Sequence, residues 1–274
     1  MSGYLKSAAT KPSVTAPRLV DMKAVGEKIV VLTCYDAGFA AQCEAAGVDV
    51  VLVGDSLGNV VQGRESTLPV TLDDMVYHTA AVKRGLSTPL LIADLPFMTY
   101  RDVDTALRSS ARLVAEGGAA MVKLEGADYV LDVINALDRR QVPVCAHLGL
   151  TPQSVHKFGG YRVQGKTKSA AERLIADAHA VEEAGASLLV LECVPAALAK
   201  TITKELRIPT IGIGAGVDCD GQVLVLYDML GVTPGKRPKF SKDFLAGSGS
   251  VLDAIKAYAK AVRGSVFPAA EHSF

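Results

Sequence analysis

The segment VVLVGDSLGN, residues 50–59, carries the pattern that decides the fold. Its apolar run predicts a β-strand that is buried on both faces, and Gly54 predicts the turn that ends it. A carboxylate, Asp55, follows at once, in a place where a buried strand by itself gives no reason for a charge. The chain repeats this arrangement at three further apolar runs, with acids at Asp94, Glu125 and Glu192.

Strand-like runs recur at regular intervals along the chain. We expect eight strands, at residues 28–33, 49–54, 89–94, 119–124, 143–148, 187–192, 209–214 and 222–228. Helical periodicity is found between most of them, among others at residues 72–85, 102–118 and 171–185, and it predicts a closing helix at residues 250–264. Alternating strands and helices are typical of parallel βαβ units. Eight such units predict an α/β protein with a single (β/α)8 barrel.

Two parts of the chain are harder to place in this barrel. The segment AGVDCDG, residues 215–221, joins the seventh and eighth strands and is too short for a crossover helix. Either that helix is missing or the eighth strand is misplaced, and a doubly wound open sheet is the alternative architecture. We expect residues 1–17 to form a polar, loose arm and residues 18–274 to form the barrel domain.

The composition is that of an ordinary globular protein, with 49% hydrophobic residues and zero net charge over 274 residues. There is no basic field that would bind nucleic acid, and no apolar run reaches the length of a membrane span. The first residues lack the apolar stretch of a secretory signal. The five cysteines form no CxxC pair, which favours a reducing compartment. We therefore expect a cytoplasmic protein.

The predicted barrel explains why acids follow several of the strands. All strands of a (β/α)8 barrel end at one mouth, and enzymes with this fold place their active sites there. Carboxylates that converge repel one another unless a cation or a shared proton compensates. Asp55 and Asp94 are hard oxygen donors that suit Mg²⁺, which takes one or two carboxylates and keeps positions open for water or substrate. The alternative is that each aspartate caps the helix that follows its strand.

Lys123 and Glu125 lie two residues apart on one predicted strand, so their side chains point to the same face. A lysine beside an acid in a barrel mouth can neutralise a substrate carboxylate or an oxyanion. A purely structural ion pair is the alternative.

Glu192 follows four apolar residues and is expected in a dry setting, where burial raises the pKa of a carboxyl group. Such a group is a candidate general base, and a surface glutamate just past the strand is the alternative. His147 ends the fifth predicted strand and could bind substrate, ligate a metal or be structural. Cys193 has no paired base in the sequence and is disfavoured as a nucleophile. The glycine-rich loop at residues 157–167 is either a lid over the mouth or a flexible connection.

Nine segments together resemble one known family. They are LVGDSLGNVVQG, STLPVTLDDMVYHTAAVKRG, IADLPFM, MVKLEG, HLGLTPQSV, GGYRVQGK, LLVLECVP, IGIGAG and EHSF. In this order they resemble the ketopantoate hydroxymethyltransferase family, also called 3-methyl-2-oxobutanoate hydroxymethyltransferase, from about residue 18 to residue 274. The resemblance implies a (β/α)8 barrel of the phosphoenolpyruvate/pyruvate type, dependence on Mg²⁺ and a homodecamer.

The resemblance also implies a reaction. The family transfers a hydroxymethyl group from methylene-tetrahydrofolate to 3-methyl-2-oxobutanoate through a Mg-stabilised enolate, which gives 2-dehydropantoate on the route to pantothenate and coenzyme A. By resemblance, Asp55 and Asp94 bind the metal and Glu125 contacts the metal site, while Glu192 accepts the proton.

The residues expected to bind the oxo acid by resemblance are Asp55, Ser56, Asp94 and Lys123, with His147 as an accessory contact. The nearest alternative is a Mg-dependent carbon–carbon lyase or mutase of oxo acids on the same type of barrel. A non-catalytic barrel that binds a metabolite is a third possibility, against which the charged groups at four strand ends argue.

Overall fold

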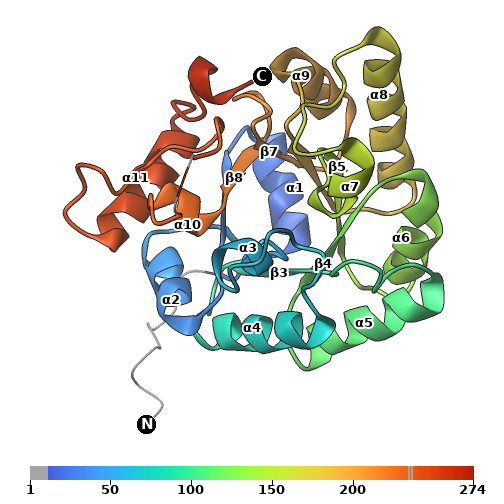
Figure 1. The fold of residues 1–274 in the computed structure, drawn as a ribbon, viewed down its shortest axis with the longest axis horizontal. Helices are drawn as coiled ribbons and strands as arrows, with labels where there is room; N and C mark the ends of the chain where they lie inside the picture. The colour runs from blue at the N-terminus through green and yellow to red at the C-terminus, as the bar shows by residue number, and fades with distance from the viewer. Residues whose placement is uncertain (1–11, 234, 236) are drawn as a thin grey trace.

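The computed structural model describes residues 12–233, 235 and 237–274, which form a closed barrel of eight parallel strands in chain order (Figure 1). The strands are β1 (Ile29–Thr33), β2 (Val50–Val53), β3 (Leu90–Asp94), β4 (Met121–Glu125), β5 (Val144–Gly149), β6 (Leu188–Glu192), β7 (Thr210–Ile213) and β8 (Gly221–Leu224). Each pairs with the next, and β8 pairs with β1 through Ile29 and Gly221, which closes the barrel. The expected (β/α)8 fold is confirmed, and an open sheet is excluded.

Most of the helices surround the ring of strands, whereas α1 lies across one end of the barrel (Figure 1). The longer ones are α1 (Ala16–Ala24), α2 (Ala37–Ala45), α4 (Leu72–Arg84), α5 (Val103–Ala115), α6 (Leu131–Asp138), α8 (Lys168–Glu183), α9 (Ala196–Glu205) and α11 (Val251–Arg263). The short ones are α3 (Leu57–Val60), α7 (Val155–Phe158), α10 (Leu226–Met229), η1 (Asp128–Val130), η2 (Pro152–Ser154) and η3 (Ala270–His272). Several begin at a side-chain cap that accepts a main-chain N–H, as Thr71 does from Asp74 at α4.

Side chains alternate between two apolar cores along each strand. Ile29 and Val31 of β1 point into the barrel, whereas Val30 and Leu32 pack against the outer helices. The interior core also contains Leu19 and Met22 of α1, so this helix packs against the barrel interior where the strands begin. The mouth at the other ends of the strands is left for polar groups.

The seventh and eighth strands are joined without a helix. Residues 214–220 form only turns, and β8 begins at Gly221, so the eighth strand is correctly placed and its crossover helix is absent. The predicted end of this strand at residue 228 is wrong, because residues 226–229 form α10. A short apolar run does not distinguish a strand from a helix.

The arm is shorter than expected from the sequence. Helix α1 begins at Ala16, with Pro17 in its first turn and with Thr15 as its cap, so the last two residues of the predicted arm belong to a helix. Val14 already donates a main-chain hydrogen bond to the Thr88 carbonyl. Residues 1–11 of the arm lie outside the described residues. No described helix is both long and apolar enough to cross a membrane.

Candidate active site

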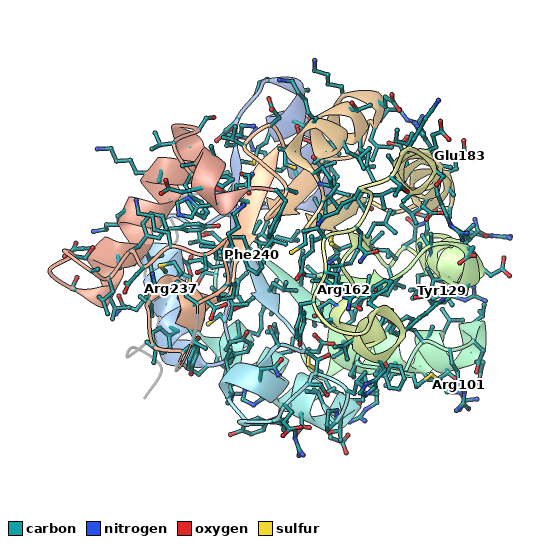
Figure 2. All side chains as sticks on the ribbon, turned by 45° about the horizontal axis from the view of Figure 1, so that its top comes forward. Arg101, Tyr129, Arg162, Glu183, Arg237 and Phe240 are labelled. Carbon is teal, nitrogen blue, oxygen red and sulfur yellow. The ribbon has the colours of Figure 1, made fainter. Side chains whose placement is uncertain are left out.

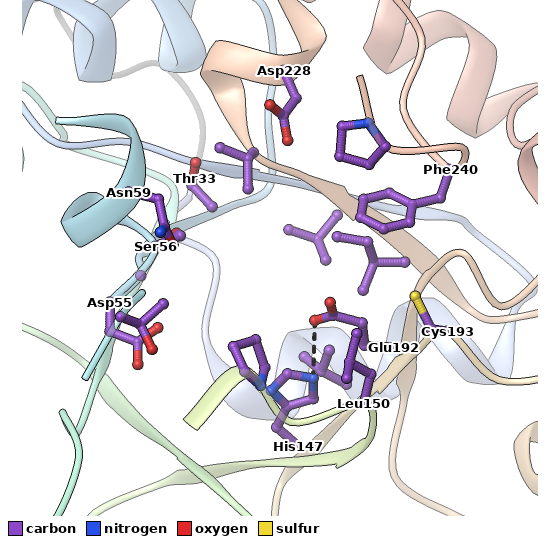
Figure 3. Close-up of a pocket in the computed structure, with 18 of the residues that line it drawn as sticks. Thr33, Asp55, Ser56, Asn59, His147, Leu150, Glu192, Cys193, Asp228 and Phe240 are labelled. Carbon is purple, nitrogen blue, oxygen red and sulfur yellow. Dashed lines mark ion pairs between the residues drawn. The ribbon is translucent and has the colours of Figure 1, made fainter. Parts of the chain in front are cut away.

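A cavity of about 500 Å³ opens at the carboxyl ends of the strands (Figure 3). Its lining includes every site residue expected from the sequence: Asp55, Ser56, Asp94, Lys123, Glu125, His147 and Glu192. They come from β3, β4, β5 and β6 and from the loop after β2. The barrel therefore brings together groups that lie up to 137 positions apart in the sequence.

Lys123 and Asp94 form a buried ion pair at the base of this cavity. The ammonium group donates to Asp94 Oδ1 at 2.7 Å, and the main-chain N–H of Asp55 donates to Asp94 Oδ2 at 3.0 Å. Burial lowers the pKa of Lys123, but the surrounding carboxylates, Asp94 first, raise it well above its ordinary value. Lys123 is therefore a permanent positive charge that neighbours more than one acid.

Asp55 lies close to two further carboxylates, Asp94 and Glu125. Burial, then the charges of Asp94 and Glu125, raise the pKa of Asp55 to about 8. Lys123 pairs with Asp94 and His147 lies beside Glu125, but within the described residues no cationic side chain forms an ion pair with Asp55. The charge of Asp55 itself is therefore left to be balanced by a proton or by an added cation.

The alternative that these aspartates cap helices is wrong. Helix α5, which follows β3, is capped by Asp102, whose Oδ1 accepts the N–H of Thr105. Helix α3, which follows β2, has no side-chain cap, and Asp55 Oδ2 accepts instead from the Gln153 amide. Both carboxylates are therefore held by groups at the mouth of the barrel, Asp94 by Lys123 and Asp55 by Gln153.

His147 lies between two acids. Its Nδ1 is 3.4 Å from Glu125 Oε1, and its Nε2 is 3.3 Å from Glu192 Oε2, the contact drawn as a dashed line in Figure 3. Burial and then the charge of Lys123 lower the pKa of His147, but the carboxylates of Glu125 and Glu192 outweigh both effects and raise it to about 9. Within the described part of the chain, neither ring nitrogen nor Glu125 Oε1 has a partner with hydrogen-bond geometry. These buried atoms are unsatisfied and can accommodate a ligand or water.

Glu192 is mostly buried and lines the cavity, so the alternative of a surface glutamate is wrong. Its neighbours on the cavity wall include Leu150 and Phe240, and Figure 3 shows its carboxylate opposite Asp55 across the open space. The adjacent Cys193 is also buried, and desolvation raises the pKa of its thiol to about 12. A neutral thiol at physiological pH agrees with its rejection as a nucleophile.

The loop at residues 157–167 reaches the mouth. Tyr161 lines the cavity, and the main-chain N–H of Gln164 donates to the Cys193 carbonyl at 3.0 Å. On the other side, Phe240 and Phe274 line the same cavity. In Figure 2 Phe240 and Arg162 lie near the centre of the barrel and Glu183 lies at its rim.

Gln153 is the site residue that sequence reasoning missed. Its side-chain amide donates to Asp55 Oδ2 at 2.8 Å, and its main-chain N–H donates to Glu125 Oε2 at 3.0 Å. Its amide oxygen accepts from the Tyr100 hydroxyl at 2.6 Å. The only signal in the sequence is a polar residue in the turn after the fifth strand, and this does not identify its partners.

Asp55 and Asp94 are the side chains best suited to hold a divalent cation. In the described residues, no three His, Cys, Asp or Glu side chains are close enough to enclose a metal by themselves. Mg²⁺ does not need such a cage, because it usually takes one or two carboxylates and fills its remaining positions with water or substrate. The excess negative charge around Asp55 and the unsatisfied Glu125 oxygen agree with an added cation.

The fold and the cavity together define a class of protein. Polar and charged groups at the strand ends of a (β/α)8 barrel are typical of enzymes that act on small molecules at the mouth. Solved structures agree with this fold. A phosphonopyruvate hydrolase aligns with a TM-score of 0.62 at 14% identity, over 93% of this chain and 98% of that one. A 2,3-dimethylmalate lyase of the PEP mutase/isocitrate lyase superfamily aligns with a TM-score of 0.58 at 20% identity, over 80% and 84%.

Sequence comparison then identifies the family. The model of ketopantoate hydroxymethyltransferase matches residues 13–270. The chain is 56% identical to the 3-methyl-2-oxobutanoate hydroxymethyltransferase of Paraburkholderia phytofirmans and 57% identical to that of Burkholderia thailandensis, over 99% of each sequence in both cases. The chain is an enzyme that belongs to the ketopantoate hydroxymethyltransferase family, as its sequence motifs predict.

Proposed function

We propose that the protein transfers a hydroxymethyl group from methylene-tetrahydrofolate to 3-methyl-2-oxobutanoate and forms 2-dehydropantoate for pantothenate biosynthesis. The observation that carries this proposal is the placement of Glu192 across the cavity from Asp55 (Figure 3), in a lining that also contains the Asp94 and Lys123 ion pair. Glu192 is a candidate base, and the other three residues form a candidate site for the oxo acid. The names of the close relatives support the same reaction.

Asp55 and Asp94 are proposed to hold Mg²⁺, with Glu125 as a further contact of the metal site. When bound, the ion would act as a Lewis acid toward the oxygens of the oxo acid. Lys123 contributes a fixed positive charge where negative charge develops on the substrate. Ser56, whose Oγ lies 2.9 Å from the Tyr35 hydroxyl, can donate a hydrogen bond to the substrate carboxylate.

Glu192 is proposed to remove the proton from the branched carbon next to the carbonyl group. That carbon then forms a bond to the methylene carbon of methylene-tetrahydrofolate. Water supplies the hydroxyl oxygen of the hydroxymethyl group, the bonds from the methylene carbon to the folate nitrogens break, and tetrahydrofolate leaves. The unsatisfied ring nitrogens of His147 are suited to hold the substrate as an accessory contact. Leu150 and Phe240 give the cavity wall an apolar part that suits the branched hydrocarbon end of the oxo acid.

Deuterium exchange tests this function in its simplest form. In deuterated buffer with Mg²⁺, the enzyme is expected to exchange the proton on the branched carbon of 3-methyl-2-oxobutanoate without any folate. Proton removal needs only the base, Glu192, and the metal site at Asp55 and Asp94. Adding methylene-tetrahydrofolate should give 2-dehydropantoate, and a chelator should stop both reactions. NMR of the substrate measures the exchange. A lyase or a passive binder would give no exchange, and that result would contradict the proposal.

We further propose that the protein is a cytoplasmic homo-oligomer, a decamer by resemblance to the family. Its five cysteines are free and buried, which suits a reducing compartment. The chain has a mass of 28.7 kDa, so sedimentation at micromolar concentration is expected to give a species close to ten times this value. A stable monomer under these conditions would contradict the proposed assembly.

A further inference from the structure

Gln153, in the loop after β5, contacts three other strand ends at the mouth through its side-chain amide and its main-chain N–H. Its amide nitrogen donates to Asp55 Oδ2 at 2.8 Å and to the Leu95 carbonyl at 3.1 Å. Its main-chain N–H donates to Glu125 Oε2 at 3.0 Å. The residue is buried and therefore links the loops after β2 and β3 with the end of β4.

Tyr100 determines which way the Gln153 amide points. The Tyr100 hydroxyl lies 2.6 Å from Gln153 Oε1, and burial raises the pKa of this phenol far above its ordinary value, so the group remains a donor. An amide whose oxygen accepts from Tyr100 must direct its NH₂ group to the other side. That side contains Asp55 Oδ2 and the Leu95 carbonyl, which are both acceptors.

We propose that Gln153, oriented by Tyr100, is a positioning residue that holds the Asp55 carboxylate in the geometry needed to bind a divalent cation. This inference rests on the proposed metal site. The contact with Gln153 engages Oδ2 only, and among the described residues no hydrogen bond engages Asp55 Oδ1, which leaves that oxygen for a ligand. Partners of this kind orient metal-binding side chains and contribute strongly to metal affinity.

A neutral amide suits this position for an electrostatic reason. Asp55 lies near Asp94 and Glu125, and repulsion drives a free carboxylate away from such neighbours. A lysine in place of Gln153 would add a charge that competes with the metal, and a glutamate would add a further negative charge. The amide holds Asp55 by a hydrogen bond and leaves the net charge of the site unchanged.

The test is a double-mutant cycle read by metal binding. Mn²⁺ affinity is measured by calorimetry, without substrate, for wild type, Gln153→Met, Tyr100→Phe and the double variant. Methionine keeps the length of the side chain and retains the main-chain N–H that binds Glu125. We expect Gln153→Met to bind Mn²⁺ about 10- to 100-fold more weakly, and Tyr100→Phe about 2- to 10-fold more weakly. In the double variant, Tyr100→Phe should cause no further loss, because its effect passes through Gln153.

Gln42→Met, on the exposed surface of α2, is the matched control and should bind Mn²⁺ like wild type. Unchanged affinity in Gln153→Met, or losses that simply add in the double variant, would overturn the positioning role. If Gln153→Met does not fold, unchanged affinity in Tyr100→Phe would overturn it equally. A wild-type protein that binds no Mn²⁺ would instead contradict the metal site of the proposed function. The experiment therefore separates the two proposals.

Discussion

The Glu192→Gln variant is expected to lose roughly 10²- to 10⁴-fold of the rate of both deuterium exchange and 2-dehydropantoate formation. Glutamine keeps the shape of the side chain and its position opposite Asp55, but it cannot accept a proton. The oxo acid should still bind, because Asp55, Asp94 and Lys123 are unchanged. Substrate NMR and a product assay give the two rates, and calorimetry with Mg²⁺ gives the binding affinity.

Glu183→Gln is the matched control for this change. Glu183 is exposed at the end of α8, on the rim of the barrel (Figure 2), and this variant should keep both rates. If Glu192→Gln exchanges the proton at the wild-type rate, another group is the base, and Glu125 or His147 is then the next candidate. If binding is lost instead, Glu192 positions the ligands and is not the base.

The Lys123→Met variant is expected to destabilise the fold by about 3–5 kcal/mol, because it removes one partner of a buried ion pair and leaves Asp94 without a counter-charge. The loss of stability is larger because Lys123 also compensates the negative charges of Asp55 and Glu125. Activity should be lost as well, since the fixed positive charge beside Asp94 would be removed from the proposed oxo-acid site. Chemical denaturation of the metal-free protein measures the free energy of unfolding.

A double variant separates charge from packing. In Lys123→Met with Asp94→Asn, both members of the pair are neutral, so much of the stability should return while activity stays low. Lys260→Met, exposed on α11, is the control and should leave the free energy of unfolding nearly unchanged. A loss below about 1 kcal/mol in Lys123→Met, the range of a surface pair, would show that this lysine does not compensate the buried carboxylates.

The sequence alone determined the strands and therefore the barrel. Strands buried on both faces are continuous apolar runs, and the spacing between all but the last two of these runs fits a crossover helix. Seven of the expected strands overlap the observed ones closely, and the eighth differs only because its apolar run continues into α10. The fold in turn predicts that acids at the strand ends meet at one mouth, as Asp55, Asp94 and Glu192 do.

Only the tertiary structure decided which of these groups touch one another. Gln153 and Asp55 are 98 positions apart, and their hydrogen bond depends on how the loops after β2 and β5 fold over the mouth. The position of His147 between Glu125 and Glu192 likewise depends on the register between neighbouring strands. Local sequence periodicity predicts which face of a helix or strand is buried. It does not predict which group a polar side chain contacts. That contact depends on long-range packing and on the charges of groups from distant segments of the chain.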